Sequence, residues 1–223
     1  MPSRLRPTAP VAPDAILVGD PGRALLLAQE LLEQPRMSNH ARGLWGYSGQ
    51  TEEGHGLTIQ ATGMGGPSAA IVLADLAKLG VRRAIRVGTC TGLAPEIEAG
   101  DLVLAAEAVA RGGSAAAYGV ELGESVPPDR ALFARLRESL GEASNPVRVA
   151  SLDAHPVDRA EAGDAVEAAD MQTVAVLARS RQLGVAAAAL LIVSEVGEAH
   201  LDDEALESAS RRAGIAARGA LST

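Results

Sequence analysis

The sequence has few aromatic residues and a single cysteine. Aromatic side chains make up 2% of the 223 residues, whereas 47% are apolar. A buried core must therefore be built from Ala, Val, Leu and Ile, as in helices packed against a buried sheet. The one cysteine, Cys90, excludes an intrachain disulfide framework and suits a reducing compartment. We therefore expect a cytoplasmic protein.

Positive charge is in deficit and long apolar runs are missing. There are 20 Lys and Arg against 28 Asp and Glu, which gives a formal net charge of −8. Nucleic-acid partners require a basic surface, so none is expected. No apolar run is long enough to span a bilayer. The arginines near the N-terminus have no apolar segment behind them, so neither a secretory signal nor a membrane partner is expected.

Short strands and helices are predicted to alternate along the chain. Residues 1–13 contain four prolines and are expected to be an irregular leader. Strands are expected at 14–18, 57–61, 83–88, 102–110, 147–150 and 185–193. Helices are expected at 23–33, 68–79, 129–140, 171–182 and 202–220. The alanine-rich run 185–193 also allows a helix. Residues 14–223 are thus predicted to form one α/β domain.

Small residues follow three of these strands, at 19–22, 63–67 and 88–92. Ligands of α/β sheets gather at such strand ends, where small residues let backbone N–H groups approach an anion. Any one such turn is most often only a turn. Arg23 follows the first turn, and Arg86 lies in an apolar strand before the third. Arg86 is either salt-bridged or a ligand for phosphate or carboxylate, and the three turns together favour an anion site.

Four segments together resemble the nucleoside phosphorylase-I family, which includes purine nucleoside phosphorylases, uridine phosphorylases and thioadenosine nucleosidases. They are GDPGR at 19–23, GMGGPS at 63–68, RVGTC at 86–90 and GDLV at 100–103. The resemblance implies a single α/β domain with a central twisted, partly barrel-like mixed sheet flanked by helices. It also implies phosphorolytic cleavage of a nucleoside's N-glycosidic bond, which yields free base and pentose 1-phosphate. Inorganic phosphate would be the co-substrate, with no metal or organic cofactor.

The resemblance also implies roles for individual residues. The phosphate ligands would be Gly19, Arg23, Arg42, Arg86 and Thr89. Among these, Arg42 would complete a neighbouring subunit's site, so the working unit would be a dimer or a dimer-built hexamer. The sugar and base would be contacted by Met64, Cys90, Thr91, Met171, Gln172 and Ser194.

Glu195 and Arg86 would be the catalytic residues. A carboxyl at the end of a buried strand can act as a general acid, and Glu195 would protonate the leaving base. The other interpretation of Glu195 is a solvated or helix-capping side chain in a polar stretch.

Departures from the family pattern cluster on the sugar and base side. Gln172 stands where a glutamate is usual, Glu195 where an aspartate is usual, and Thr91 where a glycine is usual. The segment 150–155 lacks an aromatic residue, and His155 could stack on the base instead. These changes suggest a purine or modified nucleoside as substrate. Three alternatives remain open: a pyrimidine nucleoside phosphorylase, a nucleoside hydrolase, and a catalytically weak nucleoside- or phosphate-binding homologue.

Overall fold

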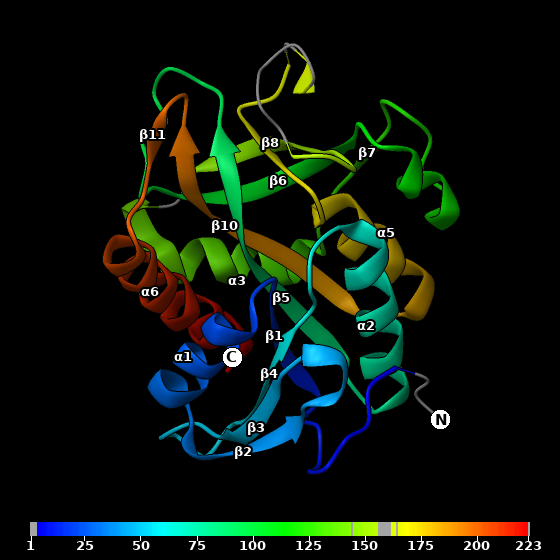
Figure 1. The fold of residues 1–223 in the computed structure, drawn as a ribbon, viewed down its shortest axis with the longest axis vertical. Helices are drawn as coiled ribbons and strands as arrows, with labels where there is room; N and C mark the ends of the chain where they lie inside the picture. Colours follow the sequence, from blue (N-terminus) through cyan, green and yellow to red (C-terminus); the bar gives the residue numbers. More distant parts are fainter. Residues whose placement is uncertain (1–3, 144, 156–161, 164, 223) are drawn as a thin grey trace.

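The computed structural model describes residues 4–143, 145–155, 162–163 and 165–222. They form one α/β domain around an eleven-stranded mixed sheet (Figure 1). The strands are β1 Asp14–Val18, β2 Glu33–Asn39, β3 Gly46–Gln50, β4 Gly56–Ala61, β5 Arg83–Gly92, β6 Leu102–Ala110, β7 Ser125–Val126, β8 Pro146–Ser151, β9 Ala168–Asp170, β10 Ala186–Val196 and β11 Ala199–His200. The helices are α1 Pro21–Leu31, α2 Gly66–Lys78, α3 Arg130–Leu140, α5 Thr173–Leu183 and α6 Asp203–Leu221. Short 3₁₀ turns occur at Ala41–Gly43, Gly113–Tyr118 and Gly141–Ala143.

Part of the sheet closes on itself. The strand order is β11-β10-β6-β8-β9-β5-β1-β4-β3-β2, and β10 pairs with β5 as well as with β6. Strands β5, β10, β6, β8 and β9 therefore form a closed ring, and β1 to β4 extend from it as an open sheet. This confirms the predicted partly barrel-like mixed sheet. The parallel pairs β1–β4, β1–β5 and β5–β10 bring the carboxyl ends of four strands to one edge.

Helices cover both faces of the sheet. Helices α1, α3 and α6 pack together on one face, and α2 and α5 pack together on the other (Figure 1). Two large apolar clusters fill the layers between helices and sheet, built almost entirely from Ala, Val, Leu and Ile as the composition predicted. Gly214 lets α6 approach α1 closely, because a Cβ at this position would lie 2.6 Å from the Leu27 side chain.

The predicted elements are all present, with shifted boundaries. Strand β6 matches its predicted range, and α3 and α6 begin one residue after the carboxylate caps Asp129 and Asp202. The run 185–193 is a strand rather than a helix. Helix α1 ends at Leu31 rather than at residue 33, because the chain turns extended at Leu32 and enters β2.

Two boundary corrections affect the site. The predicted turn at 88–92 is wrong, because β5 continues to Gly92, where it pairs with both β10 and β9. The predicted helix at 171–182 begins only at Thr173, so Met171 and Gln172 lie in the connection that follows β9. The described part of the leader, residues 4–13, contains neither helix nor strand.

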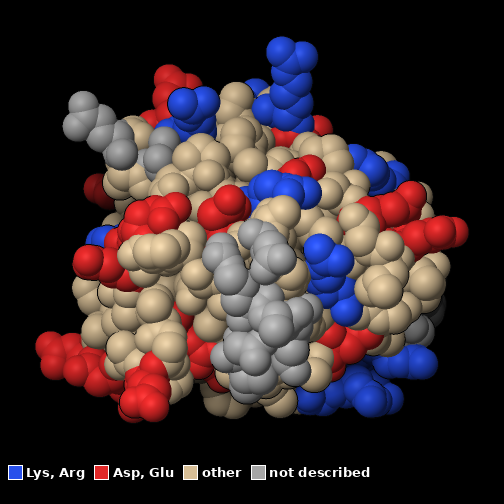
Figure 2. Space-filling view, turned by 90° about the horizontal axis from the view of Figure 1, so that it is seen from above, with Lys and Arg blue, Asp and Glu red and all other residues tan. Residues whose placement is uncertain are grey.

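Charged side chains are mixed on the molecular surface. On the face shown in Figure 2, the described Lys and Arg side chains alternate with Asp, Glu and uncharged residues, so they form no continuous basic surface there. Within the described part of the chain, none of the helices has the length and apolar character needed to cross a membrane.

Candidate active site

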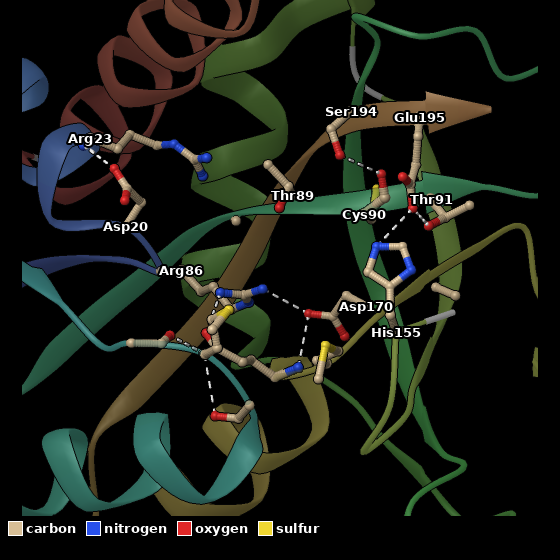
Figure 3. A pocket seen from close by; sticks show the side chains of 18 of the residues that line it. Asp20, Arg23, Arg86, Thr89, Cys90, Thr91, His155, Asp170, Ser194 and Glu195 are labelled. Carbon is tan, nitrogen blue, oxygen red and sulfur yellow. Dashed lines mark hydrogen bonds and ion pairs between the residues drawn. The ribbon is translucent and has the colours of Figure 1, made fainter. Parts of the chain in front are cut away.

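A pocket of about 500 Å³ lies at the edge where the carboxyl ends of β1, β4, β5 and β10 meet (Figure 3). Its lining comprises Gly19, Asp20, Pro21, Arg23, Gly63, Met64, Gly65, Arg86, Gly88, Thr89, Cys90, Thr91, His155, Ala169, Asp170, Met171, Gln172, Ser194 and Glu195. Every residue that the sequence predicted for the site is among them except Arg42. Arg42 lies exposed in the 3₁₀ turn Ala41–Gly43, with a left-handed backbone (φ 63°).

The first helix points its N-terminus into this pocket. Asp20 caps α1, and its Oδ1 accepts a hydrogen bond of 2.8 Å from the backbone N–H of Arg23. Pro21 occupies the first helical turn, where no intrahelical N–H bond is lost. The N-terminus of a helix carries unpaired N–H groups and partial positive charge, which together favour a bound anion.

Two arginines lie on the same side of the pocket as this helix (Figure 3). Burial lowers the pKa of Arg23; the Asp20 carboxylate opposes this shift, and the charge of Arg86 adds to it. The two guanidinium groups are thus close enough to repel each other. A bound anion would relieve both the repulsion and the cost of burial.

Arg86 is held by hydrogen bonds on all three of its nitrogens. Its Nη2 donates to Asp170 Oδ2 at 2.8 Å, its Nη1 to Gln172 Oε1 at 2.6 Å, and its Nε to Thr173 Oγ1 at 3.4 Å. The guanidinium also packs on Gly88, where a Cβ would lie only 2.4 Å from it. Arg86 is therefore salt-bridged, which is one of the two interpretations that the sequence left open, and its side chain also lines the pocket.

Asp170 is a buried carboxylate that sequence reasoning missed as a site residue. Its oxygens accept hydrogen bonds from Ser151 Oγ at 2.5 Å and Thr173 Oγ1 at 2.8 Å, as well as from Arg86. The backbone N–H groups of Gln172 and Thr173 also point at it. A charge this deeply buried is stable only with such partners. Its only signal in the sequence was its position, directly after the two alanines 168 and 169.

Gln172 is the residue before α5 and its side chain is buried, with 4% of the residue exposed. The sequence placed Gln172 inside a helix, and this is wrong because Gln172 lies between Asp170, which ends β9, and Thr173, which begins α5. The amide Nε2 donates to the carbonyl of Gly63 at 2.5 Å and to that of Gly65 at 3.3 Å.

Glu195 lies on the opposite side of the pocket from the arginines (Figure 3). It belongs to β10 itself, which continues past a register shift between Val193 and Glu195, so its predicted place after the strand is wrong. Its carboxylate accepts a hydrogen bond from the Thr91 hydroxyl. Two imidazoles flank it, with His155 Nε2 at 3.4 Å and His200 Nδ1 at 3.3 Å.

His200 is the second residue that sequence reasoning missed. It is paired directly with Glu195 across β10 and β11, and its side chain is largely exposed. Because β11 is a two-residue strand in a polar turn, no periodic pattern marked it. Glu195 is 15% exposed, so solvent reaches this end of the pocket past the two imidazoles.

The remaining predicted residues differ in burial. Met64 is 88% exposed at the pocket mouth, whereas Cys90 is buried in its wall. Burial raises the pKa of the Cys90 thiol, and the charge of Asp170 adds to that shift. Ser194 donates to the Cys90 carbonyl at 3.3 Å. Among the described residues, no group of three or more His, Cys, Asp or Glu side chains could hold a metal ion.

Comparison with known proteins finds clear relatives. The family model described as the phosphorylase superfamily matches residues 13–222. A purine nucleoside phosphorylase of the DeoD type from Clostridium perfringens is 44% identical over 96 residues, which are 43% of this chain and 40% of that protein. The corresponding protein of Mycoplasma genitalium is 36% identical over 120 residues, which are 53% of this chain and 48% of that protein. The chain thus matches less than half the length of these curated relatives.

Solved structures match over nearly the whole chain. Uridine phosphorylase from Vibrio fischeri ES114 has a TM-score of 0.85 and 25% sequence identity, covering 95% of this chain and 92% of that one. Purine nucleoside phosphorylase from Toxoplasma gondii, in complex with immucillin-H, has a TM-score of 0.83 and 21% identity over the same shares of the two chains. At 21% identity, the similarity to the Toxoplasma gondii protein concerns the fold alone.

Proposed function

The chain belongs to the phosphorylase superfamily, and we propose that it cleaves the N-glycosidic bond of a nucleoside with inorganic phosphate, which releases free base and a pentose 1-phosphate. The observation that carries the proposal is the pairing of Arg23 and Arg86 in one pocket with the N-terminus of α1. An acid, Glu195, lies on the other side of the same pocket. A nucleoside bound between the arginines and Glu195 would have phosphate on one side of its glycosidic bond and a proton donor on the other.

The phosphate end favours an oligomer. Within the pocket the charges of Arg23 and Arg86 are matched by Asp20 and Asp170, so little net positive charge is available for a dianion. The dipole at the N-terminus of α1 and the Thr89 hydroxyl add favourable interactions with an anion but no full charge. We infer that Arg42 of a second copy supplies the missing cation, which requires at least a dimer and is compatible with a hexamer built from dimers.

The chemistry needs little covalent catalysis. As the glycosidic bond breaks, its electron pair moves to the base nitrogen and the sugar gains oxocarbenium character. A phosphate oxygen held by Arg23 and Arg86 then bonds to the anomeric carbon, and Glu195 gives a proton to the base. Positioning and fixed charges can supply most of the acceleration in such a reaction. No step requires a metal or organic cofactor, and we expect the reaction to take place in the cytoplasm.

We favour a purine or a modified purine as the base. The curated relatives are purine nucleoside phosphorylases, with 44% identity over 96 residues in one case. The Thr91 hydroxyl and the His155 imidazole both lie against Glu195 where the base would bind, which supports an altered base. A pyrimidine nucleoside is the second candidate, because the similarity to uridine phosphorylase has a TM-score of 0.85.

The direct test is base release from inosine, adenosine, guanosine, uridine and base-modified analogues, with and without phosphate. The proposal predicts release that depends on phosphate. Equal release without phosphate would identify a hydrolase, and ligand binding in calorimetry without release would identify a binding protein. Full-rate turnover of unmodified inosine, adenosine or uridine would contradict the modified base while leaving phosphorolysis intact.

A further inference from the structure

We propose that Gln172 is a positioning residue that fastens the loop Gly63–Gly65 to Arg86, and that it does not bind the sugar of the substrate. The inference rests on the proposed phosphorolysis for its sugar readout, but its phosphate readout stands without it. It replaces the sugar- or base-binding role that the family resemblance suggested for position 172.

The amide nitrogen of Gln172 has no donor left for a substrate. A primary amide carries two N–H bonds, and those of Gln172 point at the carbonyls of Gly63 and Gly65, at 2.5 and 3.3 Å. Both glycines have left-handed backbones, with φ of 72° and 79°. This conformation favours glycine, so glycine at both positions favours the loop conformation in which these two carbonyls face Gln172.

The amide oxygen is engaged from the other direction. It accepts from Arg86 Nη1 at 2.6 Å, and the Thr62 hydroxyl lies 3.2 Å from it. That hydroxyl also lies near the carbonyl of Val18, at 3.0 Å. Exchanging the amide oxygen and nitrogen would aim N–H groups at the guanidinium and an oxygen at two carbonyls. The amide can therefore adopt only one orientation.

This set of partners distinguishes glutamine from glutamate. A carboxylate at position 172 could pair with Arg86, but its second oxygen would face the carbonyl oxygens of Gly63 and Gly65, which are acceptors as well. It would have to leave the loop. Gln172 thus fits a loop whose carbonyls lie directly against its side chain, whereas a carboxylate would fit only a loop that lies farther away.

Arg86 gains a defined orientation from this contact. A guanidinium has five N–H bonds, and three are directed at Gln172, Asp170 and Thr173. Among the described residues, this leaves one N–H on each terminal nitrogen for a ligand in the pocket. Loss of the Gln172 contact would leave Nη1 without this partner while Asp170 and Thr173 still hold Nη2 and Nε, so the orientation of Arg86 would loosen and the effect should fall on phosphate.

The test compares Gln172→Met, which keeps the shape without polar atoms, and Gln172→Glu with the wild type. The control is Gln50→Met, at an exposed position of β3. Calorimetry measures the Kd for inorganic phosphate, and kinetics measures kcat/KM for inosine and 2′-deoxyinosine. We expect Gln172→Met to bind phosphate about 10- to 100-fold more weakly, as for loss of one hydrogen bond to a charged group. Gln172→Glu should also bind phosphate more weakly, because a second carboxylate beside Arg86 offsets the positive charge that phosphate needs. In Gln172→Met the ratio of kcat/KM between the two nucleosides should stay within about twofold of the wild-type ratio, since removal of a group that touches neither sugar costs both substrates equally.

Two results would overturn the inference. One is an unchanged Kd for phosphate in Gln172→Met with a native circular dichroism spectrum. The other is a selective loss for inosine over 2′-deoxyinosine, which would show that Gln172 contacts the 2′-hydroxyl. If the wild type cleaves neither nucleoside, phosphorolysis of these substrates fails, and the calorimetric arm still decides the role of Gln172. If Gln172→Met does not fold, Gln172→Glu, which keeps the side-chain volume, provides the calorimetric readout, and an unchanged Kd for phosphate in that variant would overturn the inference.

Discussion

The carboxylate of Asp170 anchors the guanidinium of Arg86 through a 2.8 Å hydrogen bond between Oδ2 and Nη2, and both side chains are at most 5% exposed. Removing the charge of one partner in such a pair leaves the other charge buried without compensation. The pair joins β5 to the end of β9, so it supports the fold and holds an arginine at the pocket at the same time.

Replacing Asp170 with Asn should therefore destabilise the protein strongly. We expect the free energy of unfolding to fall by roughly 3–5 kcal/mol, the usual effect of breaking a buried ion pair. Urea unfolding followed by circular dichroism measures this. Asp153→Asn is the control, because Asp153 is an exposed carboxylate that also accepts hydrogen bonds from Ser114, and it should change stability by less than about 1 kcal/mol. Similar losses in both variants would mean that burial of Asp170 is unimportant.

Replacing Arg23 with Gln should weaken phosphate specifically. Arg23 contributes a partly buried charge beside the α1 N-terminus, and we expect the KM for phosphate to rise about 10- to 100-fold. The KM for nucleoside should change much less. Initial rates at varied phosphate concentrations measure the effect, with Arg181→Gln, an exposed position of α5, as the matched control. An unchanged KM for phosphate would remove Arg23 from the phosphate site.

Replacing Glu195 with Gln should lower kcat by about 10²- to 10⁴-fold, the usual contribution of a general acid. A p-nitrophenyl pentoside, whose leaving group needs no proton, should be affected far less. Glu198→Gln, an exposed position in the turn between β10 and β11, is the control. If both substrates slow equally, Glu195 acts by position or charge and not as a proton donor.

Arg42 should act across subunits. Arg42→Ala and Arg23→Gln should each be poorly active, but subunits mixed by co-expression should recover activity, because a hybrid dimer contains one site with both arginines. Random pairing of equal amounts predicts about a quarter of wild-type activity, since half of the dimers are hybrids with one of two sites intact. Absence of recovery in verified hybrids would show that Arg42 serves no neighbouring site.

Cys90 should make stability depend on pH in the alkaline range. Its pKa is raised by burial in the folded protein, whereas in the unfolded chain the thiol ionises near its ordinary pKa of about 8.5. The stabilising effect is therefore complete below that pH and is lost above it, by up to about 1.4 kcal/mol per pH unit. Unfolding curves from pH 7 to 10 should show this slope in the wild type and a shallower one in Cys90→Ala. Parallel curves would contradict the burial of the thiol.

Local patterns were enough to predict the elements of the core. Strand β1 is five buried residues in a row, of which four are apolar, and α6 begins at a carboxylate cap and shows helical periodicity. Strand β2 was missed because its residues are mostly polar and exposed at the edge of the sheet, so nothing alternates. The extension of β5 was missed because Thr91 is held in a strand by its pairing with Ala169, which is distant in the sequence.

The residues of the candidate site likewise include some that local sequence predicts and some that depend on distant partners. The turns at 19–22 and 63–67 and Arg23 could be found because they follow strands in the sequence. Asp170 and His200 could not, because each becomes part of the site only through a partner on another strand, Arg86 for one and Glu195 for the other. Gln172 was found, but the saturation of its amide depends on the backbone of a loop more than a hundred residues away.

The most direct test of phosphorolysis is ³¹P nuclear magnetic resonance of the enzyme with phosphate and the best nucleoside from the panel. The account predicts that a phosphate monoester resonance, that of the pentose 1-phosphate, grows in proportion to the free base released. Release of base as free pentose, with the inorganic phosphate signal unchanged, would contradict it.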